Sequence, residues 1–294
     1  MNIVLSAAAR TPTGAFRGEL SSVKASKLGA VAIEGAISRA GIEKSDVDLV
    51  FMGCVLQAGM GQAPARQAAL YAGLDQSTPA VTLNKMCGSG MEAVLQAYRA
   101  VALGAARIAI AGGMESMSNA PYLLPGARGG LRMGNKEIID SMIHDGLWDV
   151  YNDQHMGSCA ELCATRYEFS REAQDEFAER SYRRAQEASG NGAFAREIVP
   201  VEVQGRRGQV TTVSEDEGPH NVDFEKMRKL RPAFVNDGTV TAANASTIND
   251  GAAALVVTTE EVARERGMPI LARIGGYASS AGAPEMFTTA PVGA

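Results

Sequence analysis

Apolar positions along the chain follow two alternating patterns. Short runs that are apolar almost throughout predict strands buried on both faces of a sheet. Runs with apolar residues three and four positions apart predict amphipathic helices. The predicted strands cover residues 2–8, 48–55, 79–87, 107–113 and 249–259, and a further strand is predicted to start at Ile270. The predicted helices cover residues 26–41, 61–73, 91–102, 170–190 and 260–267. Gly41 is expected to end the first helix, Pro64 to lie in the first turn of the second, and Ser170 to cap the fourth. Because strands and helices alternate, we expect βαβ units and a layered α/β fold.

The composition changes after Ser118, where glycine, proline, asparagine and charged residues become frequent. We expect residues 1–118 and 249–270 to form one core domain, with residues 119–248 inserted as a mostly polar subdomain. Within the insertion, the alternating pattern that starts at Glu197 predicts a small hairpin. Residues 271–294 begin a further segment of the fold.

Composition and charge narrow the functional classes. The 294 residues are 46% hydrophobic and 21% charged, with a formal net charge of -5. This composition is typical of a globular protein, and its negative charge argues against nucleic acids or anionic membranes as partners. No run reaches the roughly 18 apolar residues that span a bilayer, and the N-terminus does not resemble a signal peptide. The four cysteines include no C-x-x-C pair, so we expect a reducing, cytoplasmic location.

The stretch NKMCGSGMEA, residues 84–93, places Cys87 where a predicted strand turns into a helix. Gly88 and Gly90 permit a tight turn and a close approach by a substrate. The helix N-terminus offers unpaired N–H groups and a partial positive charge, which suit a thiolate nucleophile and a developing oxyanion. The alternative is a small buried side chain, because free cysteines are among the most buried residues. We assign that structural role to Cys54, which lies inside an apolar run.

Five further segments accompany the Cys87 motif: GQAPARQAAL (61–70), AGGMESMSNAPY (111–122), HMG (155–157), KLRPAF (229–234) and TVTAANASTINDGAAAL (239–255). In order and spacing they resemble thiolase segments, most closely those of the short-chain acetyl-CoA acetyltransferases. The resemblance covers nearly the whole chain. It implies a layered αβαβα fold with an inserted loop subdomain, whose second half begins at residues 271–294 and is incomplete. It also implies interconversion of two acetyl-CoA with acetoacetyl-CoA and CoA through a cysteine acyl-enzyme.

The same resemblance assigns roles to individual residues. Cys87 would accept the acyl group, and its backbone N–H would help to form the oxyanion hole. The residues that would line the pantetheine channel and acyl pocket, or contact the pantetheine, are Leu147, His155, Met156, Ala242 and Ser246. Acyl-CoA thioesters would be the substrates, no separate cofactor or metal is implied, and a homo-oligomer, either dimer or tetramer, is expected.

Two positions depart from the family pattern. Related short-chain enzymes carry an arginine that meets the CoA nucleotide, whereas the matching stretch here contains Pro219 and His220. Phe287 occupies a position where short-chain relatives tend to have methionine. The first departure affects the nucleotide contact that the family would make, and the second affects the shape of the acyl pocket.

The spacing of His155, Cys159 and Cys163 invites a metal-site interpretation. If the segment is helical, the first and third residues lie about 12 Å apart along the helix axis, at 1.5 Å per residue. That separation is too large for one zinc ion, whose ligand bonds are near 2.0 to 2.3 Å. A helix at this segment would therefore exclude the three-residue site.

Three thiolase motifs are missing from the sequence: the G-H-P-x-G motif of the activating histidine, the C-x-G-G-G motif of the second catalytic cysteine, and the N-E-A-F motif. Three hypotheses follow. The chain is a C-terminally truncated piece of a thiolase, a short non-catalytic protein that binds acyl-CoA, or a different condensing enzyme such as a decarboxylating ketoacyl synthase. The segments GGMESMSNAPY and HMG argue against the third, and we expect the first.

Overall fold

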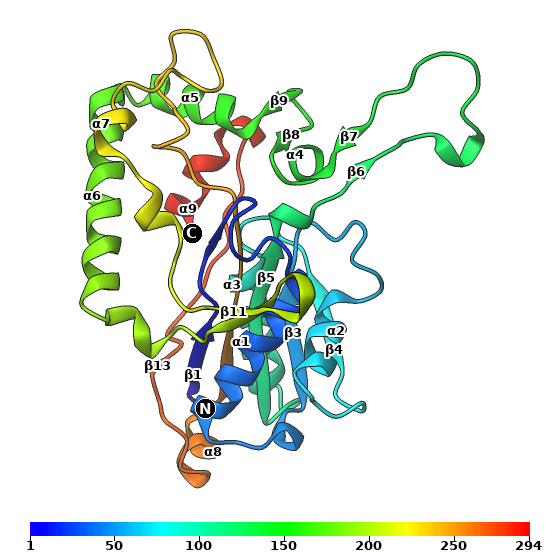
Figure 1. Ribbon diagram of the computed structural model, residues 1–294. Coiled ribbons are helices and arrows are strands. Elements are labelled where there is room, and N and C mark those ends of the chain that lie inside the picture. Colours follow the sequence, from blue (N-terminus) through cyan, green and yellow to red (C-terminus); the bar gives the residue numbers. More distant parts are fainter. The chain divides into compact units, whose positions relative to one another are not determined.

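The computed structural model describes all residues, 1–294, as two compact units. The first unit consists of residues 1–119, 192–217 and 249–276. The second consists of residues 120–191, 218–248 and 277–294. Figure 1 labels most of the helices and strands of both units.

A seven-stranded mixed sheet forms the centre of the first unit. Its strands lie in the order β13 (Ala272–Arg273), β1 (Ile3–Arg10), β12 (Asn249–Thr259), β5 (Ile108–Ser116), β3 (Leu49–Gly53) and β4 (Ala80–Leu83), with β2 (Gly14–Ala15) paired to β12. The pairs β5–β3 and β3–β4 are parallel, whereas β12 runs antiparallel to both β1 and β5. The alternation of strands and helices therefore predicted the α/β class correctly.

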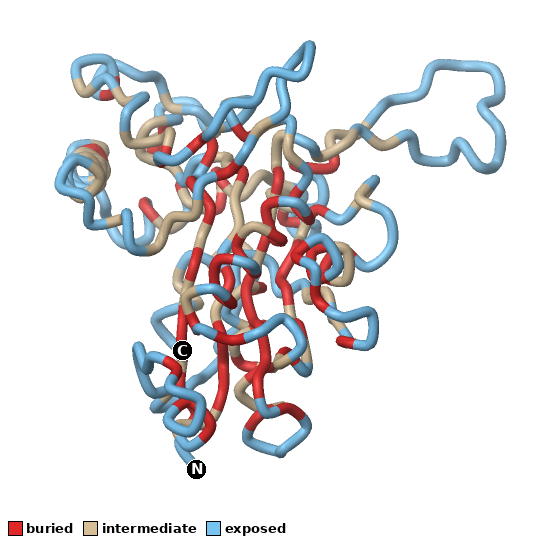
Figure 2. Tube along the Cα trace, turned by 60° about the horizontal axis from the view of Figure 1, so that its bottom comes forward, coloured by how far each residue is buried: buried red, intermediate tan, exposed pale blue.

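Helices cover both faces of this sheet, and Figure 2 shows its central strands largely buried. Alternate residues of β5 point to opposite sides: Ile108 and Ile110 belong to one apolar cluster, Ala109 and Ala111 to the other. The first cluster includes residues of α1 (Ala25–Ala40) and α2 (Pro64–Tyr71), and the second includes residues of α3 (Ser89–Ala102). The period of two in the strands and the helical period in the helices produce these two cores.

Two helix boundaries follow local chemistry. α1 ends at Gly41, which adopts φ 67° and donates to the carbonyls of Ile37 and Ser38; glycine takes this left-handed conformation at little cost. α2 begins with Pro64 at its first position, where the missing N–H costs nothing. Both features were predicted from the sequence. A short helix, α8 (Glu260–Glu265), follows β12 and is capped by the Thr259 side chain.

Residues 192–217 belong to the first unit, although they lie within the range predicted as an insertion. They contain the hairpin of β10 (Val201–Gln204) and β11 (Val210–Val213). Arg10 of β1 fixes both ends of the segment through Glu197, at 2.7 Å, and Asp216, at 2.7 and 2.8 Å. This interaction explains why the segment packs with the sheet. The functional boundaries of the domains stay a prediction.

Helices dominate the second unit. They are α4 (Ser141–Gly146), α5 (Met156–Arg166), α6 (Arg171–Gly190), α7 (Phe224–Met227) and α9 (Ala290–Gly293). Two small hairpins pair β6 (Tyr122–Leu123) with β7 (Ile139–Asp140) and β8 (Trp148–Asp149) with β9 (Gln154–His155). α6 is capped by the Ser170 hydroxyl, as the sequence predicted. None of the helices in the chain combines the length and apolar character needed to cross a membrane.

Two predicted strands are shorter than expected. The run of residues 79–87 forms a strand only at β4, because residues 84–88 turn toward α3. The run that starts at Ile270 forms only the two-residue β13. In both places the apolar pattern continues past the residues that find a pairing partner.

Candidate active site

Cys87 lies in the turn between β4 and α3 of the first unit and is exposed. Gly88 is the N-cap residue of α3 and no side chain caps the helix. The first backbone N–H groups of a helix have no partner within it and carry a partial positive charge. An accessible thiol therefore stands at the positive end of a helix, where the N–H groups of Gly88 and Ser89 donate to the carbonyls of Lys85 and Met86.

The turn owes its shape to Met86 rather than to a glycine. Met86 has φ 47°, a conformation that non-glycine residues rarely adopt, whereas Gly88 has φ -87°. The Ser89 hydroxyl accepts from the N–H of Lys85 at 2.8 Å and donates to the carbonyl of Met86 at 2.6 Å. The Asn84 side chain accepts from the N–H of Met86 at 3.0 Å. Gly88 and Gly90 were expected to permit the turn, but the left-handed residue in it is Met86, which side-chain hydrogen bonds hold in place.

Glycines bring the start of α3 against the sheet. A Cβ on Gly53 would lie 2.6 Å from the carbonyl carbon of Ser89 and 2.8 Å from the nitrogen of Gly90. A Cβ on Gly113 would lie 3.4 Å from the Cα of Gly90. Only a hydrogen atom fits at Gly53, whereas a Cβ on Gly113 would make an ordinary van der Waals contact. The position of the Cys87 turn therefore depends on the end of β3, where Gly53 lies.

The charges next to the turn are paired. Glu92, in the first turn of α3, contacts Lys85 at 2.8 Å and Arg99 at 2.9 Å. Hydrogen bonds from Lys85, Arg99 and Gln96 lower the pKa of Glu92 to about 2 against a smaller effect of burial. A carboxylate with so low a pKa is a weak base, so Glu92 does not suit the role of proton acceptor.

Two other cysteines have environments that suppress reactivity. Cys54 is buried, and its Sγ lies 3.6 Å from Oε1 of Glu115. Burial, and then the neighbouring Glu115 charge, raise the pKa of the Cys54 thiol. Burial likewise raises the pKa of Cys159, whose nearest acidic neighbour is Asp149. These are features of structural cysteines, in agreement with the interpretation of Cys54.

The other five predicted site residues lie in the second unit. Leu147 and Met156 are neighbours, because the N–H of Met156 donates to the carbonyl of Leu147 at 2.8 Å. His155 ends β9 and caps α5: its Nδ1 accepts from the N–H of Gly157 at 2.9 Å. The imidazole also stacks on Phe234, with ring centroids 4.8 Å apart. The hydrogen bond fixes Nδ1 as an acceptor, so a neutral ring carries its proton on Nε2.

The environment of His155 favours the neutral ring. Partial burial lowers its pKa from the ordinary value of 6.5. Because α5 is helical from Met156 to Arg166, Cys159 and Cys163 lie one and two turns along the helix from its cap. Along a helix, His155 and Cys163 lie about 12 Å apart, which is too far for both to bind one metal ion. The three-residue metal site is therefore ruled out.

Ala242 and Ser246 are exposed at two ends of a tight loop. The N–H of Ala245 donates to the carbonyl of Thr241 at 3.0 Å, and the Asn244 side chain accepts from the N–H of Thr241 at 2.7 Å. These contacts present a small methyl group and a hydroxyl on a loop whose backbone is hydrogen bonded. Asn244 and Ser89 were not predicted, because their role depends on contacts that no spacing rule encodes.

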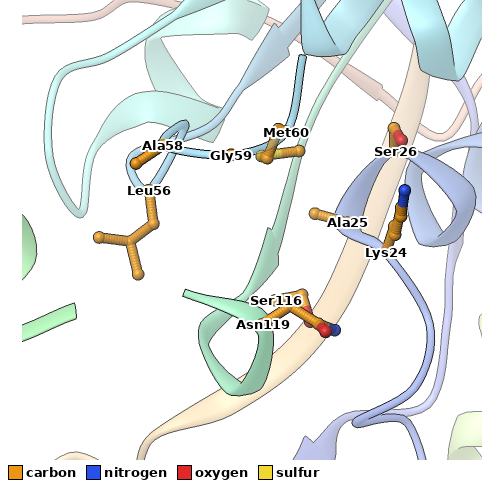
Figure 3. Close-up of a pocket in the computed structure, with 9 residues that line it drawn as sticks. All are labelled: Lys24, Ala25, Ser26, Leu56, Ala58, Gly59, Met60, Ser116 and Asn119. Carbon is orange, nitrogen blue, oxygen red and sulfur yellow. The ribbon is translucent and has the colours of Figure 1, made fainter. Parts of the chain in front are cut away.

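A separate cavity of about 110 Å³ lies in the first unit, at the N-terminal end of α1 (Figure 3). It is lined by Lys24, Ala25 and Ser26, by the loop from Leu56 to Met60, and by Ser116 and Asn119. None of the six residues predicted from the sequence lines it. Cys87 thus lies on an open turn rather than in this cavity.

Comparison with known proteins identifies the family. The model of the thiolase N-terminal domain matches residues 3–261. Acetyl-CoA acetyltransferase 2 of Arabidopsis thaliana is 54% identical over 285 residues, which are 96% of this chain and 71% of that protein. An acetyl-CoA acetyltransferase of Pseudomonas aeruginosa is 47% identical over 294 residues, 100% of this chain and 75% of that protein.

A solved structure gives the same result for the fold. The crystal structure of Acat5 thiolase from Ascaris suum in complex with coenzyme A superimposes with a TM-score of 0.92 at 41% identity. The match covers 98% of this chain and 74% of the other. The thiolase-like α/β fold expected from the sequence is confirmed, and the chain belongs to the thiolase family.

Proposed function

We propose that Cys87 accepts the acetyl group of acetyl-CoA, as in the first half of a thiolase reaction. The observation that carries this proposal is the exposed thiol on a strained turn at the uncapped N-terminus of α3. Relatives named acetyl-CoA acetyltransferase support acetyl-CoA as the donor. The family match also favours this function over a ketoacyl synthase.

The step is a thioester exchange. The Cys87 thiol gives up its proton to solvent, and the thiolate Sγ attacks the carbonyl carbon of the acetyl group. The backbone N–H of Cys87 and the partial positive charge at the start of α3 stabilise the negative charge that develops on the carbonyl oxygen. The bond between that carbon and the CoA sulfur then breaks, and the CoA thiolate leaves and takes a proton from solvent. The product is acetyl-Cys87 and one CoA.

The second unit supplies residues for the pantetheine arm in this proposal. Leu147, Met156 and Ala242 offer apolar contacts, and the exposed Ser246 offers a hydroxyl to the pantetheine amides. His155, held neutral by partial burial, offers its Nε2–H as a donor. These roles rest on the family resemblance and on the accessibility of each group.

The proposal stops at the acetyl-enzyme. Condensation needs a base that removes a proton from the α-carbon of a second acetyl-CoA. The family motifs that carry the activating histidine, the second catalytic cysteine and the asparagine are missing from the sequence. We expect no acetoacetyl-CoA thiolysis by this chain alone. Assembly as a homo-oligomer and a cytoplasmic location stay predictions.

Release of CoA from acetyl-CoA tests the proposal. The chain should release one CoA per chain and then stop, Cys87→Ser should release none, and Cys163→Ser should behave as the parent. Cys163 is a suitable control because it is partly exposed in the second unit. Binding of CoA without release would contradict the proposal and support the non-catalytic acyl-CoA-binding protein instead.

A further inference from the structure

Glu161 is a buried acid on α5 whose carboxylate contacts a distant stretch of the chain. The residue is 7% exposed. Oε1 accepts from the N–H groups of Thr239 and Val240 at 2.8 and 2.7 Å. Oε2 accepts from the N–H and the hydroxyl of Thr239 at 2.9 and 2.8 Å. The carboxylate therefore binds two consecutive backbone amides and a side chain of one segment.

These hydrogen bonds hold the backbone of residues 239 and 240 in place, which simple side-chain packing would not do. A buried carboxylate is costly unless donors surround it, and charge-assisted bonds to N–H groups are short and directional. The approach leaves no room for a side chain at Gly238, where a Cβ would lie 2.3 Å from Oε1 of Glu161. The segment after Gly238 is thereby held in one register against α5.

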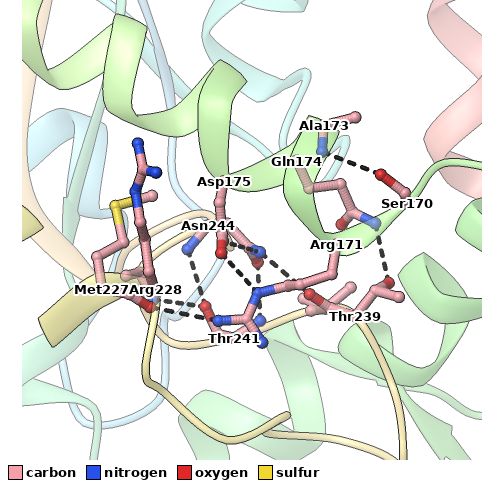
Figure 4. Close-up of polar contacts among 12 residues, drawn as sticks. Ser170, Arg171, Ala173, Gln174, Asp175, Met227, Arg228, Thr239, Thr241 and Asn244 are labelled. Atoms are coloured by element: carbon pink, nitrogen blue, oxygen red, sulfur yellow. Dashed lines mark hydrogen bonds and ion pairs between the residues drawn. The ribbon is translucent and has the colours of Figure 1, made fainter. Parts of the chain in front are cut away.

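A second group of polar contacts holds the same segment from α6 (Figure 4). The Asn244 amide donates to the carbonyl of Thr239 at 3.1 Å and to Asp175 at 2.9 Å. Asp175 is also bound by Nε of Arg171 at 2.7 Å. Thr239 thus contacts both helices, through Glu161 and through Asn244.

The position of Glu161 in the chain gives the contact a functional meaning. α5 begins at Met156 directly after His155, and the segment held by Glu161 leads into Ala242 and Ser246. We propose that Glu161 is a positioning residue that fixes the loop 239–246 relative to the start of α5. Both parts of the pantetheine site are then held in one arrangement, and the inference rests on the proposed function of these residues.

The test compares CoA binding by Glu161→Ala, Glu161→Gln and Glu172→Ala, measured by isothermal titration calorimetry. Glu161→Ala leaves two backbone N–H groups without their acceptor and should weaken CoA binding about tenfold, the effect of 1.4 kcal/mol. Glu161→Gln should stay within about threefold of the parent, because its amide oxygen still accepts from both N–H groups. Glu172 is exposed in the first turn of α6, and its removal should have no effect.

Titration with ADP separates positioning from general damage. ADP lacks the pantetheine arm, so its affinity should be the same for Glu161→Ala and the parent. Equal CoA affinity in these two proteins, or an equal loss for CoA and ADP, would overturn the inference. If Glu161→Ala fails to fold, Asn244→Ala serves instead, and it should also weaken CoA more than ADP; unchanged CoA binding in a folded Asn244→Ala would overturn the inference.

The inference and the proposed function can fail separately. CoA binding that weakens in Glu161→Ala supports the inference even when no acetyl group reaches Cys87, a result that would overturn only the proposed function. Conversely, if Cys87 is acetylated normally and Glu161→Ala binds CoA as tightly as the parent does, only the role of Glu161 is overturned.

Discussion

The Ser89 hydroxyl donates a 2.6 Å hydrogen bond to the carbonyl of Met86, the residue that precedes Cys87 and has φ 47°. The same hydroxyl accepts from the N–H of Lys85. A non-glycine residue in this conformation costs on the order of 1–3 kcal/mol and persists only where its surroundings hold it. The orientation of Cys87 therefore depends on a buried serine two positions away.

Ser89→Ala should relax the turn and slow the acetylation of Cys87 by about tenfold, because the lost hydrogen bonds contribute about 0.5–1.5 kcal/mol each. Rapid-quench measurement of acetylation checks this result. Ser38→Ala, at an exposed position of α1, is the matched control and should leave the rate unchanged. A parent-like rate in Ser89→Ala would show that the turn keeps its shape without the hydroxyl.

Gly53→Ala should displace the start of α3, because the added methyl group would overlap the backbone of Ser89 and Gly90. Overpacking of this kind costs about 1–3 kcal/mol, measured here as the free energy of unfolding in urea. Cys87 acetylation should slow as well. Gly190→Ala, where nothing lies near the new Cβ, should be neutral in both measurements, and a neutral Gly53→Ala would contradict the proposed close packing.

Removal of the Asp216 carboxylate should destabilise the first unit. Asp216 is largely buried and makes a bidentate contact with Arg10. Asp216→Asn leaves the Arg10 charge poorly paired, and we expect a loss of about 2 kcal/mol in the free energy of unfolding. Lys226, exposed and paired with Asp223, offers a control: Lys226→Ala should change stability by less than about 0.5 kcal/mol.

The same ion pair predicts acid sensitivity. Burial raises the pKa of Asp216, but hydrogen bonds from Arg10 and from the N–H of Thr13 outweigh it and place the pKa below the ordinary 3.8. The stabilisation is present above pH 3.8 and is lost as pH falls through the lower, folded-state pKa. The acid limb of a stability profile should therefore be shallower in Asp216→Asn than in the parent.

His155 predicts a second pH dependence, at milder pH. Its pKa in the folded protein is lower than the ordinary 6.5, so the folded state binds fewer protons than the unfolded state between these values. The contribution of the neutral His155 ring to the free energy of unfolding is fully present above pH 6.5. It falls as the pH drops through the folded-state pKa. In His155→Asn the amide oxygen still caps α5, so thermal unfolding should lose this part of its pH dependence. If the unfolding temperature of His155→Asn depends on pH as steeply as that of the parent, the pH dependence comes from another group.

The periodic parts of the fold were predictable from sequence. β12 matches the predicted range 249–259, and α1 and α6 match to within one residue at each end. β12 was predicted from a nearly continuous apolar run, and the helices from apolar positions that repeat with the helical period. Gly41 and Ser170 mark helix ends. β4 and β13 were overestimated, because strand length depends on which partner is available across the sheet.

The candidate site likewise contains residues whose position the sequence predicts and residues whose contacts it does not predict. The position of Cys87 between a strand and a helix was predictable from its local sequence. Its role as acyl acceptor rests on the family resemblance and stays a prediction. Ser89 and Glu161 were missed, since their partners are set by the fold; Glu161 contacts backbone 78 residues away. For Glu161, the only sign in the sequence was a charged residue on an otherwise apolar helix face. Such a residue indicates a specific contact only when its partner is known.

Peptide mapping after incubation with isotopically labelled acetyl-CoA tests the central claim most directly. The account predicts one labelled acetyl group per chain, on the peptide that contains Cys87, with none on the buried Cys54 or Cys159. Hydroxylamine should remove the label, because it is held as a thioester. A label that persists in Cys87→Ser, or a chain that binds CoA and carries no label at Cys87, would contradict it.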